Sequence, residues 1–220
     1  MSKSYRWWTL SALASVLGLA TPSRAQTAIE IGPLVGYYRP FGHFDPASAY
    51  AASLPTTPSD LRASTWGGTA RVSFNRRVGV EGQLSVANST VPGVNTPAGP
   101  REPTRAQLLM VMVQGQYDVS PIPEQFRVLL GAGPALIRHG GDAYAHFGSP
   151  VSPGGAIGVG VTLPMVLGLQ LTAGASALFY PFDVKMPPNV DTPNGQASEG
   201  SFQHGFQTDA LFHLGLRWGR

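Results

Sequence analysis

The sequence lacks cysteine altogether and is poor in charge, since only 12% of its 220 residues are Asp, Glu, Lys or Arg. Without cysteine the chain can form neither a disulfide framework nor a thiolate metal site, so its stability must come from backbone pairing and packing. Soluble domains usually have about a quarter of their residues charged. The composition is therefore atypical of a protein whose whole surface faces water.

The N-terminal segment has the pattern of a secretory signal. Lys3 and Arg6 precede an apolar run, and a short polar segment follows that ends on the small residue Ala25. Such a charged, apolar and small-residue order predicts a cleavable signal peptide over residues 1–25. The remaining residues, 26–220, show no composition break and suit a single domain.

Basic charge is scarce once this segment is removed. The segment contains three basic residues and no acid, so 15 − 3 = 12 basic residues balance 12 acidic ones, and Lys185 is the only lysine left. A formally neutral chain without a basic patch gives no reason to expect nucleic acid as a partner.

The longest uncharged stretch, residues 156–180, could cross a membrane as one helix by its length. However, Pro164 in a helix interior would cost roughly 3 kcal/mol. Apolar residues recur instead at every second position, which is the period of a strand. The stretch therefore predicts a β-hairpin with strands over residues 156–163 and 167–180 and a turn at 164–166.

Alternation of the same kind runs through the rest of the chain, and no amphipathic segment of helical period competes with it. The sequence predicts eight strands, over residues 28–38, 65–74, 78–87, 107–117, 126–137, 156–163, 167–180 and 206–218.

The connections between these strands alternate in length. Short ones, at 75–77, 118–125 and 164–166, alternate with long ones that are rich in Pro, Ser, Thr, Asn and Gly. This organisation is typical of an all-β fold: an eight-stranded antiparallel up-and-down transmembrane β-barrel with short periplasmic turns and long extracellular loops. The long loops are expected at residues 39–64, 88–106, 138–155 and 181–205.

The two faces of the strands differ in the same way throughout. One face is apolar and free of charge, so we expect it outside; the other is rich in Gly, Ser, Thr and Gln. Buried charges must be paired, and the hairpin register predicts an ion pair between Arg71 and Glu81, with Glu30 and Arg217 as a second pair by parity. The predicted polar network of the barrel interior is Glu30, Arg71, Glu81, Arg127, Asp209, His213 and Arg217.

Aromatic residues of outward parity fall at both rims, as membrane interfaces favour. Pro33 and Pro134 fall inside strands, where each removes a ladder donor, and they are expected to mark local bulges. The two predicted belts are Phe74, Tyr117, Phe126 and Trp218 at the short-turn rim, and Tyr37, Trp66, Phe179 and Phe206 at the other.

With its eight strands, its alternating connections, residues 74–83 (FNRRVGVEGQ) and the closing strand 206–218, the chain resembles the small outer-membrane β-barrel superfamily. This group includes the OmpA transmembrane domain, OmpX and OmpW-like porin-family proteins. The resemblance covers residues 26–220. It implies a monomeric barrel in the outer membrane of a Gram-negative-type bacterium, in contact with lipid, with roles from anchoring and adhesion to passage of small solutes.

Catalytic and cofactor motifs are not found in the sequence. There is no G-x-S-x-G elbow and no G-x-G-x-x-G loop, and His213 lacks the His-x-Ser context of lipid-modifying barrel enzymes. His139, Asp142 and His146 share one long loop, but a six-residue gap between the histidines is not a zinc spacing. We therefore expect no enzyme activity, no cofactor and no metal.

Three functions fit these observations. The first is a structural or surface-interaction barrel that meets an extracellular ligand or surface through its long loops. The second is a narrow porin-like channel or a conduit for small solutes, hydrophobic ones included. The third is a secreted lipocalin-like barrel that binds a ligand, although the scarcity of Lys and Glu on the polar face argues against it.

Overall fold

The computed structural model describes residues 28–41, 62–91, 95–96, 99–100, 103–121, 125–144, 149–185 and 202–219. The predicted signal peptide, His146 and most of each long connection lie outside these residues. Eight long strands form the molecule: β1 (Ala28–Pro40), β2 (Ala63–Ser73), β3 (Val78–Val91), β6 (Thr104–Asp118), β7 (Arg127–Gly140), β8 (Val151–Pro164), β9 (Leu169–Lys185) and β10 (Phe202–Gly219).

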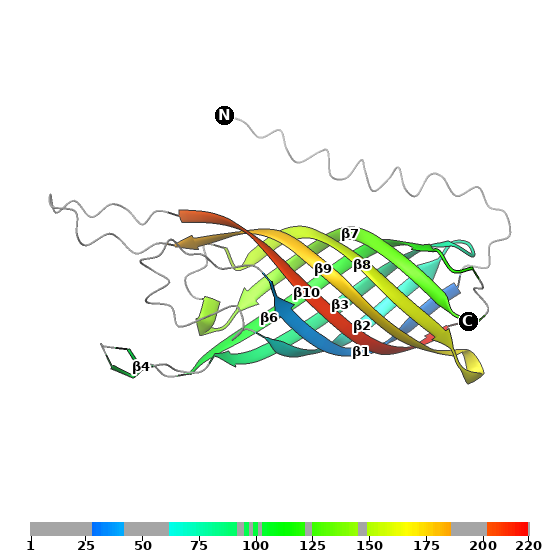
Figure 1. Cartoon of the computed structure of the whole chain (residues 1–220), viewed down its shortest axis with the longest axis horizontal. Coiled ribbons are helices and arrows are strands. Elements are labelled where there is room, and N and C mark those ends of the chain that lie inside the picture. The colour runs from blue at the N-terminus through cyan, green and yellow to red at the C-terminus, as the bar shows by residue number, and fades with distance from the viewer. Residues whose placement is uncertain are drawn as a thin grey trace, which may run out of the picture.

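These strands close into one antiparallel barrel in the order β1-β10-β9-β8-β7-β6-β3-β2 (Figure 1). The short connections and the last strand residue, Gly219, lie at one end, here the turn end, and the long connections lie at the other, the loop end. Each strand pairs with its neighbours in sequence, and β1 meets β10 to complete the up-and-down meander predicted from the alternation.

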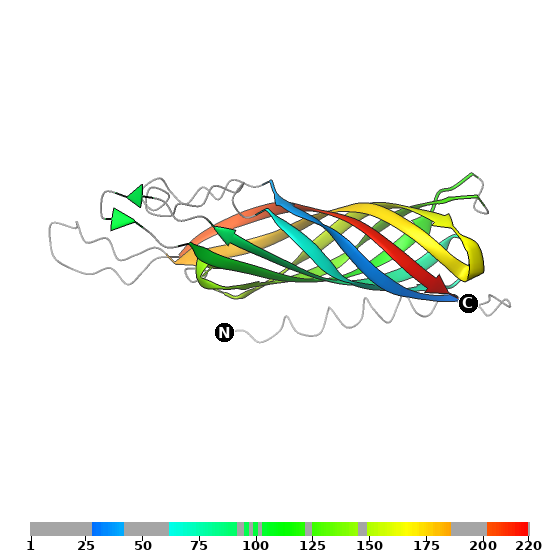
Figure 2. The ribbon, with the colours of Figure 1, turned by 90° about the horizontal axis from the view of Figure 1, so that it is seen from below.

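The strands are strongly inclined to the barrel axis (Figure 2). A path that follows paired residues once around the barrel starts at Ala28 and returns to β1 at Tyr38, a displacement of 38 − 28 = 10 residues. Barrels with such a stagger have strands tilted by roughly 35–45°. The path runs through Ala28, Ser73, Gly79, Gln116, Gly131, Gly158, Ser176, Leu211 and Tyr38.

The predicted strands are confirmed, but most extend further toward the loop end than the alternation indicated. β8 begins at Val151 rather than at residue 156, and β10 begins at Phe202 rather than at 206. Backbone pairing continues there although the hydrophobic alternation has ended. A small two-stranded sheet, β4 (Asn95–Thr96) with β5 (Gly99–Pro100), was not predicted within the connection from β3 to β6.

The hairpin of β8 and β9 is confirmed, with its turn displaced toward β9. A 3-10 turn, η3 (Val166–Gly168), joins the strands, and Leu167 in it has a φ of 59°. Strand geometry cannot include a left-handed residue, so β9 begins at Leu169 instead of Leu167. No helix in the described part of the chain is long and apolar enough to span a membrane.

Pro33 does not mark a bulge, which corrects the prediction. Pairing of β1 with β10 stops after Ile31–Trp218 and resumes at Leu34–Gly215, three residues on along each strand. Since no residue is inserted, the proline only interrupts the ladder.

Pro134 interrupts the pairing of β6 with β7 in the same way. Each proline follows a glycine that approaches the neighbouring strand closely. A Cβ on Gly32 would lie 1.7 Å from the carbonyl oxygen of Leu216, and one on Gly133 would lie 2.0 Å from that of Val113. The Gly-Pro pairs therefore allow close strand contact without a change of register.

Apolar side chains cover the outside of the barrel. The five exposed aromatic residues of the predicted belts lie on this face, and the interior positions between the outward ones are buried or half-buried. The exposed belt residues are Tyr37, Trp66, Tyr117, Phe206 and Trp218.

Candidate functional site

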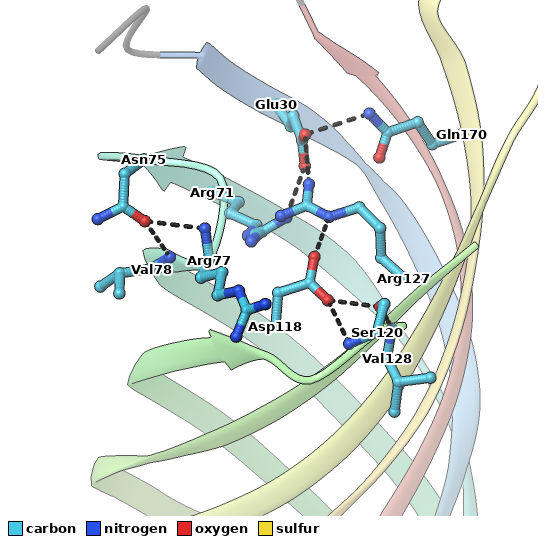
Figure 3. Close-up of polar contacts among 10 residues, drawn as sticks. All are labelled: Glu30, Arg71, Asn75, Arg77, Val78, Asp118, Ser120, Arg127, Val128 and Gln170. Carbon is cyan, nitrogen blue, oxygen red and sulfur yellow. Dashed lines mark hydrogen bonds and ion pairs between the residues drawn. The ribbon is translucent and has the colours of Figure 1, made fainter. Parts of the chain in front are cut away.

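The polar lumen near the turn end is organised around Glu30, a buried carboxylate on β1 (Figure 3). Its oxygens lie 3.5 Å from Arg71 Nη1 and 3.8 Å from Arg127 Nη1. Gln170 of β9 donates a hydrogen bond of 3.1 Å to it. Because β7 and β9 are not neighbours of β1, two of these contacts cross the lumen and brace the barrel.

Asp118 is the second carboxylate of this region and was missed in the sequence, where it was placed in a connection. It is buried at the end of β6 and accepts a hydrogen bond of 2.7 Å from Arg127 Nε. The backbone N–H and the hydroxyl of Ser120 also donate to Asp118, and Ser120 Oγ accepts from the Val128 N–H (Figure 3). The connection between β6 and β7 is thus tied to the network.

Asn75 closes the neighbouring turn between β2 and β3 at residues 74–77. Its side-chain oxygen accepts hydrogen bonds from the backbone N–H groups of Arg77, at 2.8 Å, and Val78, at 2.7 Å (Figure 3). Asn commonly supplies such bonds in turns. The turn fixes the register of β2 with β3 and so the height at which Arg71 and Glu81 enter the lumen.

Glu81 is the third carboxylate. Arg217 of β10 donates to it across the lumen at 2.6 Å, and Gln116 of β6 donates to the same oxygen at 2.7 Å. Arg217 also donates to the Thr69 hydroxyl at 3.4 Å. All these side chains are buried.

The register predicted for this region is confirmed, since Arg71 lies opposite Glu81 on paired strands. The ion pairs nevertheless form with exchanged partners: Arg71 is paired with Glu30, and Glu81 with Arg217. Gly79 explains the choice, because the Arg71 guanidinium lies over it; a Cβ there would be 3.3 Å from Nε. This space turns Arg71 toward the turn end and away from Glu81.

The remaining two predicted interior residues, His213 and Asp209, are not members of these ion pairs. His213 stands over Gly174, where a Cβ would be 2.6 Å from Nε2, and it lines the same small cavity as Glu81 and Arg217. Asp209 does not join the arginines. It lies opposite Pro40, near the loop end of β1.

Asp209 instead has neutral hydrogen-bond partners that the sequence did not reveal. The hydroxyls of Tyr38 and Tyr180 each donate to Oδ2 at 2.6 Å, and Gln207 donates to Oδ1 at 2.7 Å. All four residues are buried. A carboxylate with three donors is well stabilised without a cation, and the group ties β1, β9 and β10 together inside the barrel.

An apolar cluster fills the loop-end half of the lumen around this group. His139 packs against the rings of Tyr144, at 5.0 Å, and Tyr180, at 5.6 Å. Burial raises the pKa of Tyr144, which lies in the 3-10 turn η2 (Asp142–Tyr144), above its usual value. The largest apolar members are Leu108, Met110, Met112, Ile137, Leu178 and Leu211.

A small cavity lies beside the charged network in the described part of the lumen. This cavity, which Glu81, Gln116, His213 and Arg217 help to line, measures about 20 Å³, which is room for about one water molecule. Gln114 Nε2, which lines this cavity, is buried without a hydrogen-bond partner among the described residues, and so are the three Arg71 nitrogens outside it. The arrangement can hold charges and brace strands, and this cavity is too small for a solute larger than water.

No metal site is formed in the described parts of the chain, where no three His, Asp or Glu side chains converge. The weak candidate from the sequence depends on His146, which is outside the described residues.

Solved structures share this architecture at low sequence identity. OprG, an outer membrane protein from Pseudomonas aeruginosa, aligns with a TM-score of 0.56 and 13% identity over 88% of this chain and 96% of its own. Neisserial surface protein A gives 0.51 and 13%, over 87% and 97%. AlkL, an outer membrane protein solved in DMPC lipid bilayers, gives 0.52 and 10%, over 91% and 93%.

The chain has the fold of the small outer-membrane β-barrels. This agrees with the resemblance noted in the sequence. No protein-family model matches the sequence, and no curated protein is significantly similar to it.

Proposed function

We propose that the protein is a non-enzymatic barrel of the outer membrane of a Gram-negative-type bacterium, with a structural or surface-interaction role. Residues 1–25 serve as the export signal, and residues 26–220 form the membrane domain. The turn end faces the periplasm, and the long connections at the loop end face outside, where they meet an extracellular ligand or surface. The protein acts as a monomer.

The filled lumen is the observation that carries this proposal. Arg71, Met110, Met112 and Leu211 are all nearly or completely inaccessible within it. An eight-stranded barrel has an interior just wide enough for its own side chains. A barrel whose lumen is filled by its own side chains is suited to binding partners at its loop end rather than to conducting solutes through the lumen.

The outer face supports the membrane location. Large apolar side chains such as Ile157, Leu130 and Leu214 are about half exposed there, while Glu30, Arg71, Glu81, Asp118, Asp209 and Arg217 are buried in the lumen. A soluble ligand-binding barrel needs the reverse arrangement, with a polar outside and an apolar inside. The lipocalin-like alternative is therefore disfavoured.

Planar-bilayer conductance tests the closed lumen. We expect no steady openings from the unaltered protein. Replacing Met110, Met112 and Leu211 together by Gly removes the centre of the apolar cluster and should produce openings. A matched variant with Val111→Ala, on the outer face, should stay silent.

The same measurement tests the alternative function. Steady openings of the unaltered protein, with a conductance that changes in Glu81→Gln, would replace the present proposal by a narrow channel. Solute uptake into loaded vesicles would extend that result to uncharged solutes.

A further inference from the structure

The turn between β2 and β3 carries two exposed arginines, Arg76 and Arg77. Contacts on three sides hold Arg77 in place. Its backbone N–H donates to Asn75 Oδ1 at 2.8 Å (Figure 3), and its carbonyl accepts from the Asp118 N–H at 2.7 Å. Its Nη1 donates to the Tyr117 hydroxyl at 3.4 Å. A guanidinium has five N–H donors; one is used in this way within the described part of the chain, and the others are available to a ligand.

Exposed acid does not balance this charge. The described carboxylates of the turn end, Glu30, Glu81 and Asp118, are all buried, and each is paired with an arginine inside the lumen. Among the described residues of this end, the exposed charged side chains are therefore Arg76 and Arg77. The surface attracts an anion and offers no carboxylate to a cation.

The exposed charge is confined to one side of the barrel. In the strand order, the β8–β9 hairpin lies opposite the β2–β3 hairpin. Its turn exposes Met165, Val166 and Leu167 and contains no charged residue. An anion at the turn end would thus meet arginine at the β2–β3 turn and apolar side chains opposite it.

The apolar outer face begins directly beside Arg77. Val78 is the next residue and is paired with Tyr117, and both side chains are exposed. The next outward pair along the same strands is Val80 with Gly115. Tyrosines at a membrane interface lie at the level of the lipid head groups. The Arg77 guanidinium, which contacts the Tyr117 hydroxyl, therefore lies at the height of the lipid phosphates.

We propose that Arg76 and Arg77 bind the phosphate of an anionic phospholipid in the leaflet around the turn end. The paired N–H groups of arginine match phosphate oxygens, and the acyl chains of the lipid lie along the outer face from Val78. A zwitterionic phospholipid would add an ammonium group, for which the described rim has no exposed carboxylate. This inference rests on the proposed membrane location, and it names the lipid class that the turn end selects.

Leu130 offers a position for a local reporter. It is 49% exposed on the outer face of β7 and is paired with Tyr117. Leu130→Trp therefore places a fluorescent side chain beside the site. The chain is folded into phosphatidylcholine vesicles, and dibrominated phosphatidylglycerol or dibrominated phosphatidylethanolamine is titrated in as a quencher. Subtracting the signal of the protein without this substitution isolates the reporter from the native tryptophans.

We expect phosphatidylglycerol to bind about tenfold more strongly than phosphatidylethanolamine, as one charge-assisted contact would give. Arg76→Gln together with Arg77→Gln should reduce this ratio to about one. Arg76→Gln alone leaves every contact of Arg77 intact and should reduce it to roughly threefold, if the two arginines share the contact equally.

The matched control is Arg39→Gln together with Arg138→Gln. It removes the same charge from two exposed arginines near the loop end, far along their strands from the reporter. The lipid preference at the reporter should remain about tenfold.

Three results would overturn the site. The first is a ratio near one while both arginines are present. The second is an equal loss in the two double variants, which would indicate diffuse charge attraction. The third is relief of the quenching by excess inorganic phosphate, which would indicate a site for a free anion instead of a lipid.

Heat-modifiable gel migration, recorded on each sample, separates these outcomes from failure of the membrane proposal. A chain that does not fold into vesicles contradicts the proposed function. A folded chain without lipid preference contradicts only the site at the β2–β3 turn.

Discussion

At the scale of residues, the turn-end lumen balances three arginines against three carboxylates. Arg127 is shared between Glu30 and Asp118, while Arg217 is bound to Glu81. Removing one partner of a buried ion pair leaves a charge uncompensated, which typically costs 3–5 kcal/mol. The network is therefore expected to be sensitive to single substitutions and tolerant of paired ones.

Double-mutant cycles can show whether Glu81 interacts more strongly with Arg217, across the lumen, or with Arg71, its neighbour on the paired strand. Glu81 and Arg217 should show a coupling free energy of roughly 2 kcal/mol, since they share a direct charged hydrogen bond. Glu81 and Arg71 should show well under half of that. Urea unfolding in vesicles measures both, with each residue replaced by Gln or Met.

A larger coupling free energy for Glu81 with Arg71 than for Glu81 with Arg217 would contradict this assignment. It would support the ion pair predicted from strand register alone. Register could be read from the length of the 75–77 turn, and it placed Arg71 opposite Glu81. It could not show that Gly79 leaves room for the arginine to turn away, because that depends on the folded side chains.

At the scale of elements, the distance between the backbones of paired strands determines where a residue larger than glycine is tolerated. Gly133 of β7 sits against the Val113 carbonyl of β6, whereas Gly115 of β6 has room, since a Cβ there would lie 3.8 Å from the nearest atom. The two glycines are on the same strand pair, Gly133 on the lumen face and Gly115 on the outer face, and they differ in this clearance.

Gly133→Ala should destabilise the barrel by about 3 kcal/mol, because the overlap forces the strands apart. Gly115→Ala should change the free energy of unfolding by no more than about 0.5 kcal/mol. Unfolding midpoints of the two variants in vesicles provide the comparison. Equal midpoints would contradict the close contact.

The turn between β8 and β9 offers a stabilising substitution. Leu167 is 98% exposed and left-handed, a conformation that costs an L-residue roughly 1–2 kcal/mol. Asn tolerates this conformation, so Leu167→Asn should raise the free energy of unfolding by about 0.5–1 kcal/mol.

Met165→Asn is the control for this turn, since Met165 is exposed but has an extended backbone. It should bring no gain. If both variants were equally stabilised, loss of exposed apolar surface rather than backbone strain would be the cause.

At the scale of the whole molecule, the proposed membrane position predicts how the outer face responds to charge with depth. Leu214 lies between the outward Phe206 and Trp218 of β10 with its own side chain outward, and Thr208 lies on the same face nearer the loop end. Leu214→Arg should cost roughly 2–4 kcal/mol in vesicles and Thr208→Arg about 0–1 kcal/mol. Unfolding free energies of the two variants measure the difference, and equal small costs would contradict burial of this face in lipid.

The sequence by itself determined the strands and their faces. Alternation with a period of two is local, so residues 156–180 were correctly assigned as a hairpin rather than a helix. It also placed the seven predicted interior residues on one face of their strands. Their side chains could be oriented by parity without knowing the barrel.

Only the tertiary structure decided which of these groups meet. Glu81 and Arg217 are 136 residues apart and lie on strands that do not pair, so their contact depends on closure and on a stagger of ten residues. The same geometry sets Asp209 beside Tyr38 and Tyr180 instead of an arginine. Which side chains meet across the lumen depends on how far each strand is shifted along its neighbour. These shifts add up around the whole barrel, so they cannot be read from one hairpin.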